Sequence, residues 1–289
     1  MIPLRHSAST VFLVLLFVAC QKQFQGSVLS HDGVSIAYTS QGKGRPALVF
    51  VHGWSCDKTY WDAQVDYFAQ NYQVVTIDLG GHGESGLNRE DWNIGAFGKD
   101  VQAVVEKLDL DRIILIGHSM GGGVIVEASK HMPDRVIGLI GVDTFQNIEE
   151  KPTPEEMDAF LAPLRKDFSE ATKDFVSKYL FAPHSDSAFV EKIVTDMAEA
   201  PPEVGLSAMK NSWTYDVPSA LKEVRVPVRC INTDLYPVNV DAGKRHAKSF
   251  DVRIMSGVGH FLMMEDPETF NTLLEETIQE LVKIDRNES

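Results

Sequence analysis

Short runs of apolar residues alternate with helical patterns through the first half of this chain, and this alternation restricts the possible folds more than any other feature. Turn residues flank these apolar runs. Runs of this kind are typical of strands buried on both faces of a sheet. Alternation of this kind requires crossover connections and predicts a mostly parallel sheet flanked by helices, an α/β fold. The expected strands are 47–51, 73–78, 112–116 and 136–142, and the expected helices are 60–71, 96–108 and 121–131.

The rest of the chain divides into a hairpin, an insertion and a second set of sheet signals. Residues 27–30 and 34–40 flank His31-Asp32-Gly33, which predicts an antiparallel hairpin. From residue 146 the strand pattern stops, and apolar residues recur at helical intervals between several prolines. Strand patterns return at 226–231 and 251–255, and a helix is expected over 267–282. The sequence thus predicts one core, formed by 20–145 and 218–289, interrupted by a helical insertion at 146–217.

Charge and cysteine content exclude several classes of function. The chain has 27 Lys and Arg against 41 Asp and Glu, a formal net charge of −14, and no basic block. Binding to a nucleic-acid backbone is therefore not expected. The three cysteines are too few and too widely spaced for a disulfide scaffold or a zinc motif. No dinucleotide fingerprint or metalloprotease motif occurs, so no metal and no organic cofactor is expected.

The first residues have the pattern of an export signal. Arg5 precedes an apolar run at 11–19 that is too short to span a bilayer, so we expect a signal peptide over 1–19. The stretch Phe17-Val18-Ala19-Cys20 resembles the bacterial lipoprotein box, in which the cysteine becomes the acylated first residue. Phe17 stands where Leu is usual, which leaves plain cleavage near Ala19 as the alternative. We expect a protein anchored by lipid to the cell envelope through Cys20, or otherwise periplasmic or secreted.

The stretch Gly117-His118-Ser119-Met120-Gly121 is the most informative motif. It follows an expected strand and opens an expected helix, the setting of a nucleophile elbow. Glycines are needed at 117 and 121 because the strand and the helix approach so closely that a Cβ at either position would clash. The motif predicts that the Ser119 hydroxyl projects at the carboxyl edge of the sheet.

With this motif the chain resembles the α/β-hydrolase superfamily. Further matches are His52-Gly53-Trp54 after an early strand, the stretch 78–85 (DLGGHGES), Gly257-Val258-Gly259-His260 after the last strand, and Asp234 after the penultimate one. Their chain order, Ser then acid then His, is the order of this fold. The resemblance implies Ser119 as nucleophile, His260 as base, and the N–H groups of Met120 and Trp54 as an oxyanion hole.

Two carboxylates are candidates for the third member of this triad. Asp234 keeps the register of the family relative to the helix that follows it, although its loop is two residues shorter than usual. Asp143, at the end of the 136–142 strand, is the alternative, because some members place their acid there. We favour Asp234 at this stage.

The resemblance implies a serine hydrolase that cleaves a carboxylic ester of a small or medium apolar molecule, with the insertion as a cap over Ser119. Hydrolysis of a thioester, lactone, amide or C–C bond, or acyl transfer to another alcohol, is an alternative within the same fold. A second class is a non-catalytic envelope lipoprotein that binds a hydrophobic ligand, against which the presence of both Ser119 and His260 argues.

Overall fold

The computed structural model describes residues 23–288. The expected signal peptide at 1–19 and the candidate lipidation site at Cys20 lie outside the described residues.

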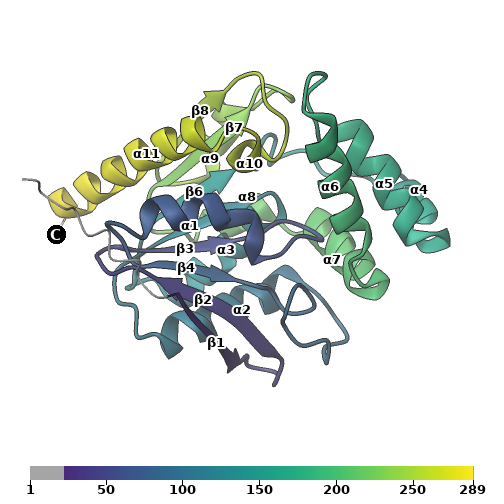
Figure 1. The fold of residues 1–289 in the computed structure, drawn as a ribbon. Helices are drawn as coiled ribbons and strands as arrows, with labels where there is room; N and C mark the ends of the chain where they lie inside the picture. The colour runs from purple at the N-terminus through teal and green to yellow at the C-terminus, as the bar shows by residue number, and fades with distance from the viewer. Residues whose placement is uncertain (1–22, 289) are drawn as a thin grey trace, which may run out of the picture.

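One eight-stranded sheet forms the centre of the molecule, in the order β1-β2-β4-β3-β5-β6-β7-β8 (Figure 1). β1 pairs antiparallel with β2, and β2 with β4, whereas all other neighbours pair in parallel. The mostly parallel sheet and the initial hairpin predicted from the sequence are both present. The strands are β1 (Phe24–Leu29), β2 (Ser35–Gln41), β3 (Ala47–Val51), β4 (Val74–Ile77), β5 (Ile113–His118), β6 (Val136–Val142), β7 (Val228–Thr233) and β8 (Phe250–Met255).

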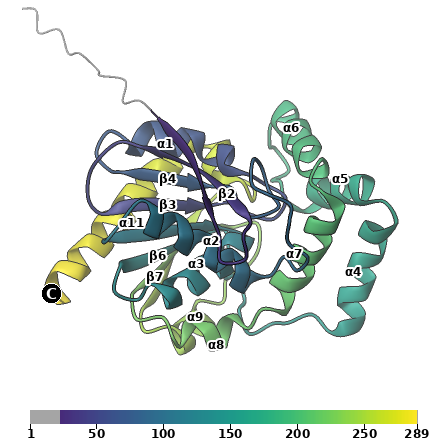
Figure 2. The same cartoon turned by 90° about the horizontal axis from the view of Figure 1, so that it is seen from below.

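Helices cover both faces of this sheet. α2 (Ile94–Lys107) and α3 (Met120–His131) pack against each other on one face, and α1 (Asp62–Phe68) and α11 (Pro267–Glu288) lie together on the other (Figures 1 and 2). Because both faces are covered, every residue of β3 to β7 is buried, which explains the continuous apolar character of β3 and β6. Short elements complete the core: η1 (Lys58–Trp61), α8 (Val217–Leu221), α9 (Val240–His246) and α10 (Leu262–Glu265).

The last helix shows how the sequence pattern becomes packing. α11 begins at Pro267, as predicted, and extends past residue 282 to Glu288. Four fully buried residues of this helix follow one another at intervals of four, four and three positions, so they form a stripe along one face. A Cβ built at Gly138 would lie 2.7 Å from Leu281 Cδ1, so this glycine lets α11 approach β6. The stripe consists of Phe270, Leu274, Ile278 and Leu281.

Four further helices, which we call the insertion helices, connect β6 to the rest of the core. They are α4 (Pro154–Lys166), α5 (Phe168–Tyr179), α6 (Ser187–Ala198) and α7 (Pro202–Thr214). Three begin at side-chain caps, supplied by Thr153, Asp167 and Asp186. They lie to one side of the sheet (Figure 1) and contact segments that directly follow β3 and β8, where the carboxyl ends of parallel strands meet. Within residues 23–288, no helix combines the length and apolar character needed to cross a membrane.

Candidate active site

Ser119 occupies a strained turn between β5 and α3. Its backbone has φ 53° and ψ −117°, a conformation that L residues rarely adopt. The Ser119 N–H donates to Val142 O at 3.0 Å, which fixes the turn to the end of β6. Backbone strain of this kind persists only where the surrounding structure holds it, and it is the conformation expected of a nucleophile elbow.

The glycines beside Ser119 are present for steric reasons. A Cβ at Gly117 would lie 2.3 Å from Gly121 O, and one at Gly121 would lie 2.7 Å from both Val51 O and His52 O. These neighbours are backbone atoms that no rotamer change can move. The structure therefore agrees with the close approach of strand and helix expected from the motif.

His260 and Asp143 form a buried pair next to this turn. His260 Nδ1 lies 2.5 Å from Asp143 Oδ2, and the Asp143 side chain is 2% exposed. Its other oxygen accepts hydrogen bonds from Thr233 N–H at 2.9 Å and from the Thr233 hydroxyl at 3.2 Å. Burial by itself raises the pKa of Asp143, but the hydrogen bonds from His260 and Thr233 outweigh it and hold this pKa below its ordinary value. Asp143 is thus ionised at neutral pH, and His260 Nδ1 carries the proton between them.

The expectation that Asp234 faces the imidazole is wrong, and the alternative, Asp143, takes that place. Asp234 is exposed, and its Oδ1 accepts from Gly257 N–H at 3.2 Å. Asp143 follows β6, the direct neighbour of the strand that carries Ser119, and its backbone φ of 42° belongs to a tight turn. Asp234 lies instead beside Gly257, at the start of the loop that carries His260, and it stands in the loop after β7 that is two residues shorter than usual.

The loop after β3 lies directly against Ser119. A Cβ at Gly53 would stand 3.2 Å from Ser119 Cβ, so the backbone at Gly53 lies close to the Ser119 side chain. His52 fixes this loop, because its Nε2 accepts from Leu79 N–H at 3.0 Å and its Nδ1 donates to Gly53 O at 2.7 Å. Trp54 is the next residue of this loop. On the other side of Ser119 in the chain, Met120 is the first residue of α3, so the N–H of Met120 has no partner inside the helix. Met120 therefore directly follows Ser119, and Trp54 directly follows Gly53, the residue that approaches it.

Trp54 also connects this loop to the insertion helices. Its indole N–H donates to Gly205 O in α7 at 2.7 Å. The Trp54 ring packs edge-on against Phe168 and Phe175 of α5, with centroids 5.9 and 6.3 Å away. The Trp54 side chain thus anchors α5 and α7 to the loop after β3.

The loop that carries His260 is held by residues that the sequence did not identify. The His260 N–H donates to Leu180 O at 2.8 Å, at the end of α5. Glu265 bridges the two segments, because it accepts from Gly259 N–H at 2.9 Å and from the Ser185 hydroxyl at 2.7 Å. His184 adds a hydrogen bond to Gly257 O at 2.8 Å. Apart from the contact between Gly259 and Glu265, these hydrogen bonds join residues far apart in the chain, so no local sequence pattern predicts them.

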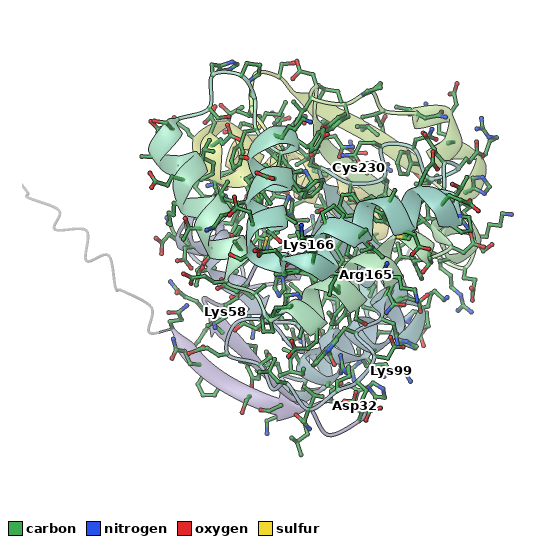
Figure 3. All side chains as sticks on the ribbon, turned by 90° about the vertical axis from the view of Figure 1, so that its right-hand side faces the viewer. Asp32, Lys58, Lys99, Arg165, Lys166 and Cys230 are labelled. Carbon is green, nitrogen blue, oxygen red and sulfur yellow. The ribbon has the colours of Figure 1, made fainter. Side chains whose placement is uncertain are left out.

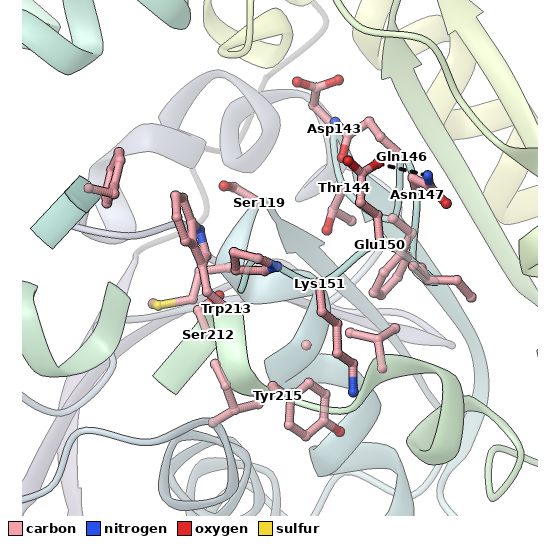
Figure 4. Close-up of a pocket in the computed structure, with 18 of the residues that line it drawn as sticks. Ser119, Asp143, Thr144, Gln146, Asn147, Glu150, Lys151, Ser212, Trp213 and Tyr215 are labelled. Atoms are coloured by element: carbon pink, nitrogen blue, oxygen red, sulfur yellow. Dashed lines mark hydrogen bonds between the residues drawn. The ribbon is translucent and has the colours of Figure 1, made fainter. Parts of the chain in front are cut away.

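Ser119, Asp143 and His260 line a single cavity of about 710 Å³. Figure 4 shows Ser119 and Asp143 among the residues of its wall. Its apolar wall comes from α2, α3 and the insertion: Ile94, Met120, Phe160, Trp213, Tyr215 and Val217. Its polar wall comes from the segment after β6, where Gln146, Asn147, Glu150 and Lys151 lie. Among residues 23–288, no group of three or more His, Cys, Asp or Glu side chains is arranged to hold a metal ion.

Comparisons with known proteins identify the family and agree with the fold. The profile of the alpha/beta hydrolase family matches residues 48–273. The chain is 26% identical over 262 residues to 3-oxoadipate enol-lactonase 2 of Acinetobacter baylyi, covering 87% of this chain and 96% of that protein. It is 27% identical over 268 residues to a non-heme haloperoxidase of Rhodococcus erythropolis, covering 84% and 96%. A solved esterase from Thermogutta terrifontis superposes with a TM-score of 0.78 at 22% identity, covering 89% and 99%, which confirms the predicted fold.

Proposed function

Because the chain belongs to the alpha/beta hydrolase family and is a hydrolase, we propose that it cleaves carboxylic esters through an acyl-enzyme on Ser119. One observation carries the proposal: a strained Ser119 shares a cavity with His260, whose Nδ1 lies 2.5 Å from a buried carboxylate. This is the constellation that acyl transfer requires.

The proposed steps follow from the protonation states. With the Nδ1 proton held by Asp143, His260 presents an unprotonated Nε2 that takes the Ser119 proton as Oγ attacks the carbonyl carbon. The N–H groups of Met120 and Trp54 stabilise the negative oxygen of the tetrahedral intermediate. Its collapse expels the alcohol, which receives the proton from His260. Water, activated by the same imidazole, then releases the acid and restores Ser119.

The cavity favours a small or medium substrate with one apolar end. Its apolar wall suits a hydrocarbon chain, and the polar segment after β6 suits a carbonyl-bearing or hydroxylated part. The relative named as an enol-lactonase supports a lactone, which is a cyclic ester, as a second candidate substrate. The insertion helices act as a cap that excludes bulk water from Ser119.

A fluorophosphonate probe combined with a series of p-nitrophenyl esters, thioesters and lactones tests this proposal. We expect labelling at Ser119 and hydrolysis of short esters, both abolished by Ser119→Ala. Ser212→Ala is the matched control, because Ser212 is another serine of the same cavity and should be dispensable. Equal hydrolysis by wild type and Ser119→Ala would refute the nucleophile, and preference for thioesters or lactones would reassign the substrate class.

We also propose, from the sequence, that residues 1–19 direct export and that Cys20 is acylated, so that the enzyme works at the cell envelope. Membrane fractionation of wild type and Cys20→Ser, with mass spectrometry of the mature amino terminus, tests this. An unmodified Cys20 on the mature protein would exclude the lipid anchor.

A further inference from the structure

Phe160 of α4 lies in the wall of two cavities. One is the cavity of about 710 Å³ that contains Ser119, and we call it the inner cavity. The other, of about 750 Å³, lies between α4 and α5, and we call it the outer cavity. Phe160 lines both, which places its ring between them.

Phe160 has one aromatic neighbour in the wall of each cavity. Its centroid lies 4.3 Å from that of Trp213, which lines the inner cavity. Its centroid also lies 5.1 Å from that of Phe175, which lines the outer cavity, at an interplanar angle of 86°. The Phe160 side chain is only half-buried, so its ring can turn aside without opening the main core.

The backbone of α4 is weakened at this point. Pro163 lies inside the helix and has no N–H, so the carbonyl of Ala159 has no donor four residues further on. Ala159 and Pro163 both line the outer cavity, one residue before and three residues after Phe160. The segment that carries the Phe160 ring is therefore the part of α4 least constrained by helical hydrogen bonds.

The lining of the outer cavity includes apolar surface that a hydrocarbon chain can contact. Phe160, Leu164, Ala171 and Phe175 contribute to it, beside five charged side chains: Lys166, Asp167, Glu170, Asp174 and Lys178. Among these is Lys166, which lies on the outward face of the insertion helices (Figure 3). Such a site suits the distal methylenes of an acyl chain whose ester carbon lies at Ser119.

We propose that Phe160 is the residue that determines acyl-chain length: long chains displace its ring and continue from the inner into the outer cavity. The inference rests on the ester hydrolysis proposed above. Each methylene that leaves water for an apolar site favours binding about fourfold, so access to the outer cavity multiplies the advantage of long chains.

The experiment compares wild type, Phe160→Ala and Phe160→Trp on p-nitrophenyl esters from acetate to palmitate. We expect Phe160→Ala to raise the ratio of long-chain to short-chain kcat/KM by at least about tenfold, mainly through KM, and Phe160→Trp to lower it. Phe189→Ala is the matched control, since Phe189 is a half-buried aromatic residue of α6 whose ring packs on Phe181, 5.9 Å away, and it lines neither cavity. A thermal unfolding measurement on each variant checks that it is folded.

A second measurement separates this inference from the proposed function. The rates at which short-chain and long-chain fluorophosphonates label Ser119 measure which chain lengths the pocket accepts, and they do not depend on ester hydrolysis. In both assays the measured quantity is the ratio of long-chain to short-chain rate. If Phe160→Ala and Phe160→Trp leave this ratio within twofold of wild type in both assays, the inference is overturned. If labelling shifts with chain length as expected but no ester is hydrolysed, Phe160 retains its role and the ester assignment fails.

Discussion

Replacing Asp143 by Asn tests the catalytic arrangement most directly. In the structure, Asp143 Oδ1 receives two hydrogen-bond donors from Thr233, and Oδ2 faces His260 Nδ1. An asparagine amide cannot turn its NH₂ toward Thr233, because donors would then face donors. The NH₂ must therefore face Nδ1, which accepts only when the imidazole proton is on Nε2. In that tautomer His260 cannot take the Ser119 proton.

The expected loss is large and confined to chemistry. A carboxylate that fixes the imidazole tautomer is worth about 10⁴ in kcat, or about 5.4 kcal/mol of barrier at 1.36 kcal/mol per tenfold. The assay is kcat on a short p-nitrophenyl ester at saturation, with thermal unfolding as a check of the fold.

Asp234→Asn is the matched control. Asp234 is exposed and uses one oxygen to accept from Gly257 N–H, which an amide oxygen also can do. We expect a change of about twofold or less, as for ordinary surface substitutions. If Asp234→Asn loses activity by thousands while Asp143→Asn keeps it within tenfold, the assignment of the acid is refuted.

Three further predictions concern stability and positioning. Burial lowers the pKa of three imidazoles from 6.5, to about 4 for His52 and about 3 for His82 and His118. Below pH 6.5 these histidines gain protons in the unfolded chain but not in the folded chain. The free energy of unfolding should therefore fall, by up to about 1.4 kcal/mol for each histidine and each pH unit, as the pH is lowered. A midpoint of urea unfolding that stays constant from pH 7 to pH 5 would contradict this. Gly121→Ala, whose Cβ meets two backbone oxygens at 2.7 Å, should cost about 1–3 kcal/mol in thermal unfolding. Gly95→Ala, whose Cβ meets only the side-chain oxygen of Asn93 at 3.3 Å, should cost less. Glu265→Ala should lower kcat about tenfold at constant KM by leaving Gly259 N–H without its acceptor, and Glu265→Gln should restore it; equal kcat in both variants would argue against a positioning role.

Much of the core follows from local pattern. The predicted strands 47–51 and 136–142 coincide with β3 and β6, because buried parallel strands are continuous apolar runs ended by turn residues. The position of Ser119 was equally predictable, since its glycines, the preceding strand and the following helix are adjacent in sequence.

The acid and the supports of His260 depend on loop geometry that no local pattern records. Asp143 and Asp234 both follow sheet strands, and only the backbone turn at Asp143 directs its carboxylate to the imidazole. Similarly, Leu180 contributes a backbone oxygen and not its side chain, so its residue type carries no signal.

The backbone hydrogen bond from His260 to Leu180 and the indole hydrogen bond from Trp54 to Gly205 tie the insertion helices to two loops of the proposed reaction centre. Deleting or exchanging that segment would remove two anchor points of the reaction centre along with the pocket wall. New specificities in this scaffold are therefore more accessible by altering individual side chains along α4 to α7 than by grafting a foreign segment, unless the graft again supplies carbonyl oxygens at those two places.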